Sequence, residues 1–248
     1  MKTAVRAWLP LVLVPALLVI SPRPAHAQAR VRIHGTVTDF RGAPLDNVTV
    51  HVKDEKFNNL YSARSGKDGR YEILVPPGMY FCLYAIREGE YKKTSLEYWA
   101  WNVPALSDIE INPQYEKLEI YAVNAFKPQV TPYDTFMVYF RPMSLSWTFK
   151  NYGPSGQVNA QPGDTIDIAP PKLEEKDLDI RINGGPAKVV SITKLKEYAR
   201  GNYLVGYLVQ CVAPADTRSV VDGFDVITVK VTDPATGDTG RADYFYRR

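Results

Sequence analysis

Short alternations of apolar and polar residues, separated by turn residues, fill the stretch from Arg32 to Ala85 and constrain the fold more than any other feature. Ile33 and Val37 share one face of the first alternation, and residues 48–52 (VTVHV) repeat the pattern. A side-chain period of two is typical of a half-buried strand, and β-branched residues favour strands. No helical apolar stripe interrupts this stretch, so we predict a β-domain.

Turn residues divide the later part of this stretch. Asp68-Gly69 is a strong hairpin signal, and we expect the strand over 71–75 to follow it. The pair Pro77-Gly78 then predicts a second turn before a strand over 79–86.

The same stretch resembles the carboxypeptidase regulatory-like domain, a small β-sandwich of transthyretin-like topology. The resemblance is carried by Gly35-Thr36-Val37-Thr38-Asp39, Gly42-Ala43-Pro44-Leu45, Val48-Thr49-Val50, Asp68-Gly69-Arg70-Tyr71 and Pro76-Pro77-Gly78-Met79-Tyr80. It implies a non-catalytic module of the kind found beside secreted peptidases and in bacterial envelope proteins. Such modules stabilise their neighbours, bind ligands or act as spacers.

The second half of the chain also predicts short strands at regular spacing. It resembles a bacterial immunoglobulin-like module through Pro162-Gly163-Asp164-Thr165-Ile166 and the closing run from Ile227 to Asp233. The predicted fold class is therefore all-β, with two tandem β-sandwiches, the first transthyretin-like and the second Ig-like. Residues 173–178 are the one exception, since they could form a single helical turn.

The first 27 residues predict a signal peptide. Lys2 and Arg6 precede the apolar run Leu9–Ile20, and Ala25-His26-Ala27 offers a small-x-small cleavage site, so we expect cleavage near Ala27. The first sandwich is then expected over 28–126. A proline-bracketed linker over 127–132 and a second sandwich over 133–248 complete the predicted organisation.

Charge limits the classes of partner. The chain has 30 basic and 27 acidic residues, and three of the basic ones (Lys2, Arg6 and Arg23) lie in the predicted leader, so the mature chain is formally neutral. Nucleic-acid binding needs a basic surface, which this composition does not supply. We expect a periplasmic or secreted protein that is not integral to the membrane after cleavage. The sequence leaves the oligomeric state open.

No motif in the sequence indicates catalysis, a metal site or a cofactor. His34 and His51 are the two histidines of the predicted mature chain, and the sequence contains neither an HExxH nor a GxSxG motif. The C-terminal Tyr244-Phe245-Tyr246-Arg247-Arg248 also differs from the Tyr-Arg-Gly-Ser tail of hydroxyisourate hydrolases, which resemble this fold. Acid pairs for glycoside cleavage depend on three-dimensional spacing, so a hydrolase stays a third alternative.

The best binding candidates are aromatic. Tyr98, Trp99 and Trp101 lie in one extended segment with Tyr91 nearby, and Trp99 and Trp101 should point the same way. Two indoles on one face can stack on a sugar or hold an apolar partner. The opposing interpretation places both indoles in the core or in the seam between the two sandwiches, because an apolar run is usually buried.

Two further features of the sequence each allow two interpretations. Cys82 and Cys211 could be buried thiols or one disulfide between the halves, since exported proteins fold in an oxidising compartment. Three acidic loops offer oxygen ligands for calcium or are ordinary solvated turns. They are Asp164 with Asp167, Glu174 to Asp179, and Asp233 with Asp238.

The sequence as a whole predicts an exported, non-enzymatic binding or structural module of the bacterial cell envelope. Its partner would be an envelope protein or a polysaccharide, held by aromatic stacking and β-edge pairing. The main alternative is a carbohydrate-binding protein with an aromatic platform at Trp99 and Trp101.

Overall fold

The computed structural model describes residues 29–129, 134–215 and 217–248. The predicted signal peptide and residues 130–132 of the predicted linker lie outside them.

The described chain is nearly all β, with a short helix, α1 (Leu145–Tyr152), and a 3-10 turn, Glu175–Asp177, where the sequence predicted a single turn. The strands are β1 (Val31–Thr36), β2 (Thr49–Lys53), β3 (Asn59–Arg64), β4 (Arg70–Val75), β5 (Gly78–Ile86), β6 (Tyr98–Ala105), β7 (Ile109–Glu110), β8 (Leu118–Phe126), β9 (Thr135–Ser144), β10 (Thr165–Ile166), β11 (Leu178–Ile182), β12 (Gly185–Pro186), β13 (Lys188–Ala199), β14 (Asn202–Val212), β15 (Phe224–Thr232) and β16 (Thr239–Arg247).

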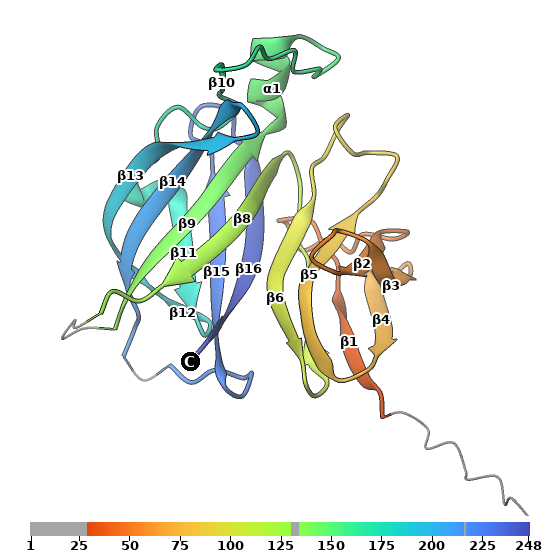
Figure 1. Cartoon of the computed structure of the whole chain (residues 1–248). Coiled ribbons are helices and arrows are strands. Elements are labelled where there is room, and N and C mark those ends of the chain that lie inside the picture. The colour runs from red at the N-terminus through yellow and green to blue at the C-terminus, as the bar shows by residue number, and fades with distance from the viewer. Residues whose placement is uncertain (1–28, 130–133, 216) are drawn as a thin grey trace, which may run out of the picture.

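One eight-stranded sheet runs through both halves of the molecule. Its strand order is β12-β11-β15-β16-β6-β5-β2-β3, so that β16 from the end of the chain lies beside β6 (Figure 1). The two strands pair in parallel, with Ala242 opposite Trp99 and Tyr244 opposite Trp101. The predicted two sandwiches are present, but they share this sheet.

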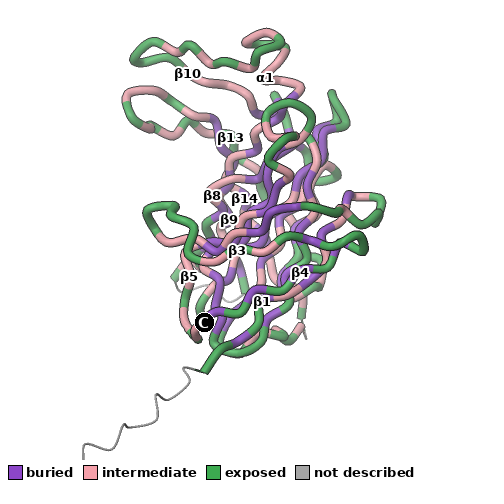
Figure 2. Tube along the Cα trace, turned by 90° about the vertical axis from the view of Figure 1, so that its right-hand side faces the viewer, coloured by how far each residue is buried: buried purple, intermediate pink, exposed green. Residues whose placement is uncertain are grey.

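A smaller sheet covers each end of the large one. The three-stranded sheet β4-β1-β7 packs over the part formed by β2, β5 and β6. The five-stranded sheet has the order β10-β14-β9-β8, with β13 also paired to β14, and it packs over β11, β15 and β16. Figure 2 shows the buried segments of all three sheets running through the interior, while the loops around α1 and β10 are half-buried or exposed.

The two cores use opposite faces of the shared sheet. In β6, Tyr98 and Ala100 belong to the core of the first sandwich, whereas Trp99 and Trp101 belong to that of the second. This division follows from the two-residue period of a strand, since neighbouring side chains point to opposite faces. A single strand therefore supplies both hydrophobic cores.

The strand β8 occupies a different place from the one that the sequence indicated. Because the first sandwich was expected over 28–126, this segment should have belonged to it, but β8 pairs with β9 in the five-stranded sheet. It also packs closely on β16, where a Cβ at Gly240 would lie 2.0 Å from the carbonyl oxygen of Leu118. Strand length and alternation were visible in the sequence, but the choice of pairing partner depends on contacts distant in sequence.

Asp68-Gly69 does not form the predicted hairpin. The flanking strands β3 and β4 belong to different sheets, so this turn carries the chain from one layer of the sandwich to the other. The strand β3 itself was not among the strands that the sequence predicted. It is an edge strand whose residues are exposed or half-buried, which leaves no clear apolar alternation in its sequence.

The helix α1 was also absent from the sequence-based expectations. The Ser144 side chain caps its N-terminus by accepting from Trp147 N, and Gly153, at φ 78°, follows its end. Within the described residues, no helix is long and apolar enough to cross a membrane.

Candidate binding site

Trp99 and Trp101, the predicted aromatic platform, are buried. Each indole is 6% exposed, and the two rings stack with centroids 5.1 Å apart and planes 16° from parallel. They point the same way, as the strand pattern predicted, but β8 and the core of the second sandwich cover them. Their position is the one given by the alternative interpretation, namely the seam between the sandwiches, and neither indole presents an open face to a ligand.

Four further aromatic rings surround the indoles, and together the six form what we call the aromatic face. Phe81 and Tyr121 meet Trp101 edge to face, and Tyr84 tilts against Trp99. The aromatic face consists of Phe57, Phe81, Tyr84, Trp99, Trp101 and Tyr121. Phe81, Tyr84 and Tyr121 are half-buried. No sequence motif indicated these four rings, because they come from β5, β8 and a loop.

Phe57 is the exposed member of the aromatic face. Its ring is 41% exposed and lies edge-on to Phe81 and Trp99, with centroid separations of 5.5 and 6.1 Å. The residue has φ 63°, a left-handed conformation that is costly for a bulky side chain. Such strain persists where the surrounding structure fixes the backbone, and it often marks a functional position.

Asp54 fixes the loop that carries Phe57. Its carboxylate accepts from Lys56 N and Asn58 N, each at 2.9 Å, and from Asn58 Nδ2, while its carbonyl oxygen accepts from Phe57 N. The hydrogen bond from the Asn58 side chain leads the contacts that lower the pKa of Asp54. The exposed phenyl ring is therefore presented on a preformed loop.

Cationic and polar groups border the aromatic face. Lys53 Nζ lies 4.9 Å from the Tyr84 ring centroid and donates to Asn59 Oδ1 at 2.6 Å, and the Arg141 guanidinium lies 4.8 Å from the Tyr121 ring centroid. His51 stacks on Tyr84, and burial lowers its pKa. A ring surface with such a border combines apolar area with polar groups at its rim.

Tyr98, another predicted binding residue, is a structural part of the seam. It is fully buried on the opposite face of β6, and its hydroxyl donates to Asp243 Oδ2. The same carboxylate accepts from Arg241 Nη2 at 3.0 Å and from Thr228 Oγ1 at 2.5 Å. Tyr98 therefore helps to hold β16 against β6.

Tyr91, the last predicted binding residue, lies beside a pair of buried carboxyl groups. Glu97 and Glu119 are 5% and 4% exposed, and Trp99 Nε1 donates to Glu119 Oε1 at 2.7 Å. Burial raises the pKa of both carboxyls, and the neighbouring Glu97 raises that of Glu119 further. No sequence motif indicates this pair, because its members lie 22 positions apart.

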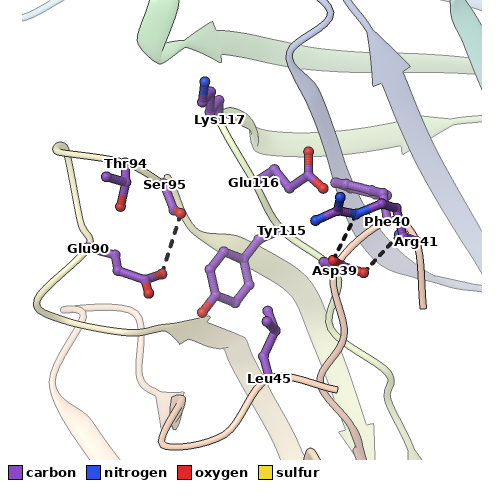
Figure 3. A pocket seen from close by; sticks show the side chains of 10 residues that line it. All are labelled: Asp39, Phe40, Arg41, Leu45, Glu90, Thr94, Ser95, Tyr115, Glu116 and Lys117. Carbon is purple, nitrogen blue, oxygen red and sulfur yellow. Dashed lines mark hydrogen bonds and ion pairs between the residues drawn. The ribbon is translucent and has the colours of Figure 1, made fainter. Parts of the chain in front are cut away.

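An open cavity of about 570 Å³ lies where the loops after β1, β5 and β7 meet (Figure 3). Tyr115 lies between Glu90 and Leu45, and burial raises its pKa to about 12. Two of the acidic groups that line it are already bonded: Asp39 accepts from Ala43 N and Arg41 N, and Glu90 from Arg87. This cavity therefore offers volume but no free acid at Asp39 or Glu90.

The acidic loops make hydrogen bonds within the protein. Asp238 accepts from Ser144 Oγ, Ser146 N and Ser146 Oγ, and Asp233 accepts from Trp147 Nε1 at 2.6 Å, so both anchor α1 to the β15–β16 turn. Elsewhere, Lys172 and Lys176 hold the pKa of Glu174 at about 2. Among the residues that the structure describes, no three His, Cys, Asp or Glu side chains gather as a metal site would require.

Cys82 and Cys211 both belong to the core of the second sandwich, and both thiols are buried and free. Burial raises the pKa of each to about 12. The structure therefore contains two buried free thiols, the first of the two interpretations, and no disulfide joins them.

A comparison with protein families agrees with the motifs of the first half of the chain. Residues 32–95 match the model of the carboxypeptidase regulatory-like domain, which confirms the resemblance drawn from the sequence motifs. The matched segment begins in β1 and ends just before β6, so it contains Phe57, Phe81, Tyr84 and Tyr91. No curated protein matches the chain.

Solved structures of low similarity include bacterial pilins. The major pilin subunit BcpA of Bacillus cereus is 8% identical with a TM-score of 0.27, and the match covers 88% of this chain and 69% of that one. The major pilin SpaA of Corynebacterium diphtheriae is 10% identical with a TM-score of 0.24, covering 82% of this chain and 62% of that one. TM-scores this low carry no inference about function.

Proposed function

We propose that this protein is an exported, non-enzymatic module of the bacterial cell envelope that binds a partner protein through the aromatic face. The observation that carries the proposal is the exposed ring of Phe57, held by a hydrogen-bonded loop directly against Trp99 and Phe81. Large aromatic side chains that fill preformed surfaces dominate the energy of protein interfaces.

Rigidity of the aromatic face supports this role. Asp54 fixes the Phe57 loop, and the stacked indoles below are buried in the seam between the sandwiches. Binding a preformed surface costs little conformational entropy, so more of the contact energy appears as affinity. The shared sheet fixes the aromatic face relative to the second sandwich, which suits a module that holds a partner in one orientation.

A non-enzymatic role is supported by the state of the ionisable groups. Glu97 and Glu119 are both buried, whereas the two acids of a glycosidase must flank the scissile bond of a bound sugar. His51 is bonded to Ser62 across the β2–β3 pair, but no acid completes a triad with them among the described contacts. The proposal of export rests on the leader pattern of the first 27 residues.

Carbohydrate binding is the second candidate for the same surface. A sugar ring would stack on Phe57 and the half-buried Tyr84, while the ammonium of Lys53 and the amide of Asn59 would meet its hydroxyl groups. This candidate replaces the predicted platform of Trp99 and Trp101, which the structure buries. A protein partner is favoured because a single exposed ring, that of Phe57, is too little for a sugar platform but suits an anchor.

A capture experiment tests the proposal. The mature chain, residues 28–248, is immobilised and exposed to envelope extract from its own host and, separately, to insoluble polysaccharides. Phe57→Ala is compared with Phe126→Ala, a matched control in which a phenyl ring of 53% exposure is removed from the end of β8. Both variants are checked for folding by circular dichroism.

We expect a discrete envelope protein that Phe57→Ala loses and Phe126→Ala retains. Retention on polysaccharide with the same dependence on Phe57 would favour carbohydrate binding instead. Equal capture by the two variants would contradict a role for the aromatic face.

A further inference from the structure

The strand β3 ends the shared sheet on the side away from β16, so one of its edges has no neighbouring strand among the described residues (Figure 1). Two other edge strands carry features that hinder pairing with another chain. The strand β12 has two residues, one of them Pro186, and β13 contains three lysines. The six residues of β3 include neither lysine nor proline. Natural sheets protect their edges, so an edge strand without these features indicates a pairing surface.

The backbone of β3 turns two residues toward this open edge. Ser65 N donates to Val48 O, and Ser65 O accepts from Asn47 N, so the backbone groups of Ser65 face the β2 side. Residues of an antiparallel strand alternate between those bonded to the neighbouring strand and those whose N–H and C=O point away from it. By this alternation, Ser62 and Arg64 each direct an N–H and a C=O outward. These outward groups are available to an added strand.

The side chains of β3 connect this edge to the aromatic face. Tyr61 packs against the core of the first sandwich, so the neighbouring Ser62 points to the opposite face of the sheet. On that opposite face, a cross-strand row begins at Ser62 and continues through His51, Tyr84 and Trp99. A residue added beside Ser62 would extend this row, and with it the aromatic face.

The start of β3 adds apolar contact area. Leu60 is 46% exposed, and the exposed ring of Phe57 precedes the strand by two residues. A segment that runs along β3 would pass both side chains, so its backbone pairing and its contact with the aromatic face would form together. Main-chain bonds then give affinity, and alternate side chains give specificity.

Two cations beside β3 have no carboxylate partner among the described residues. Lys53 Nζ donates to Asn59 Oδ1 at 2.6 Å, and Arg64 Nη1 donates to Asn47 Oδ1 at 2.8 Å, so both bond to neutral amide oxygens. Burial lowers the pKa of His51 most, and the charges of Lys53 and Arg64 lower it further. These two cations favour acidic residues in a segment that adds to β3.

We propose that an extended, acidic segment of the partner protein pairs with β3 as an added strand of the shared sheet. This inference rests on the proposed function, because it assigns the manner in which the partner reaches the aromatic face. The main chain of the segment bonds to the outward groups of Ser62 and Arg64. Its acidic side chains pair with Lys53 and Arg64, and an apolar side chain packs on Phe57.

The capture of envelope protein by two variants of Ser62 tests the main-chain pairing. Ser62→Pro removes the outward N–H and places a ring on the open edge, whereas Ser62→Ala keeps the N–H and removes the hydroxyl. Proline is tolerated on an edge strand where its nitrogen faces solvent, so both variants should fold. We expect Ser62→Pro to weaken capture by about tenfold or more, as the loss of a hydrogen bond and a steric block would. Ser62→Ala should change capture by less than about threefold.

Amide hydrogen exchange in the unaltered protein gives a measurement that needs no variant. In the free protein, the N–H groups of Ser62 and Arg64 should exchange faster than those of Tyr61 and Ala63, which face β2. The captured partner should slow exchange at Ser62 and Arg64, because strand addition gives both groups an acceptor.

The salt dependence of capture tests the acidic character of the segment. Arg64→Gln should weaken capture by about threefold at low salt and reduce its dependence on salt concentration. Arg70→Gln is the matched control, since Arg70 pairs with Asp68 and lies outside β3, and it should leave capture unchanged. Equal effects of the two variants would contradict an acidic segment at β3.

The outcomes separate this inference from the proposed function. Capture that depends on Phe57 but is unchanged by Ser62→Pro, with Ser62 and Arg64 unprotected in the complex, would overturn strand addition and leave the aromatic face as the contact. Loss of capture in Ser62→Pro but not in Phe57→Ala would support strand addition and contradict the aromatic face. Self-association of the free protein that Ser62→Pro abolishes would assign the edge to a second copy and overturn the partner segment. Capture of no envelope protein would overturn both proposals.

Discussion

Trp99 Nε1 donates a 2.7 Å hydrogen bond to Glu119 Oε1, and this contact joins the shared sheet to β8 of the second sandwich. Both residues are buried. The indole that the sequence offered as a ligand platform is thus a structural donor in the seam between the sandwiches.

Replacing this donor should destabilise the fold. Trp99→Phe leaves a buried carboxyl oxygen without its donor, so we expect the free energy of unfolding to fall by about 2 kcal/mol beyond the loss of ring area. Trp101→Phe is the matched control, because Trp101 Nε1 is buried without a hydrogen-bond partner in the described structure. Urea unfolding measures both, and equal losses would contradict the role assigned to the Trp99–Glu119 bond.

The carboxyl pair should make stability depend on pH. Because the folded protein raises the pKa of Glu97 and Glu119 above the ordinary value of 4.5, it binds more protons than the unfolded chain once the pH exceeds that value. Stability contributed by these protons is present at low pH and is lost as pH rises through the folded pKa values, at about 1.4 kcal/mol per pKa unit.

Glu119→Gln should reduce this decline, since one titrating group is replaced by a neutral isostere. Urea unfolding from pH 5 to pH 8 gives the two slopes. A wild-type slope that matches the slope of the variant would show that the pair does not carry the pH dependence.

The buried Asp238 should anchor α1. Its carboxylate accepts from the helix N-cap residue Ser144 and from both the backbone N and the Oγ of Ser146. Asp238→Asn loses the charge and forces a donor amide toward these donors, so we expect a loss of about 2 kcal/mol in stability. Asp222→Asn, at an exposed aspartate, is the control and should change stability by less than about 0.5 kcal/mol. Thermal unfolding followed by circular dichroism measures the stability of both variants. Equal losses of stability would contradict the anchoring role of Asp238.

Cys82 and Cys211 should be chemically inert in the folded protein. Both thiols are buried, and burial raises their pKa to about 12, so the reactive thiolate is scarce at pH 8. We expect a thiol-reactive dye to label neither residue in native buffer and both in urea. Rapid labelling of the native protein, or none in urea without reductant, would contradict two buried free thiols.

Local patterns in the sequence predicted much of the fold. The alternation of 224–232 coincides with β15, and the motifs of the first half led to the family that residues 32–95 match. Pairing was the part that local patterns could not give. The parallel contact of β6 with β16 joins residues such as Trp99 and Ala242, far apart in sequence, and no turn signal marks it.

The candidate site was predicted in part. The sequence indicated that Trp99 and Trp101 share a face, which the structure shows, but whether a strand face is open or covered depends on the other strands. Phe57 gave no signal, because one aromatic residue in a turn is common, and its importance comes from the strained loop and from the rings that it contacts. In contrast, the sequence contains the N-cap residue Ser144 and the following Gly153, and these two signals predict the start and the end of α1.

Hydroxyl-radical footprinting of the mature chain, with and without the captured envelope partner, tests the central claim most directly. If the aromatic face is the contact, the partner should protect Phe57, Phe81 and Tyr84 from oxidation, while the exposed Phe126 and Tyr198 react as they do in the free protein. Protection of Tyr198 on the β13 edge, with Phe57 fully reactive in the complex, would contradict the account and move the binding surface to the second sandwich.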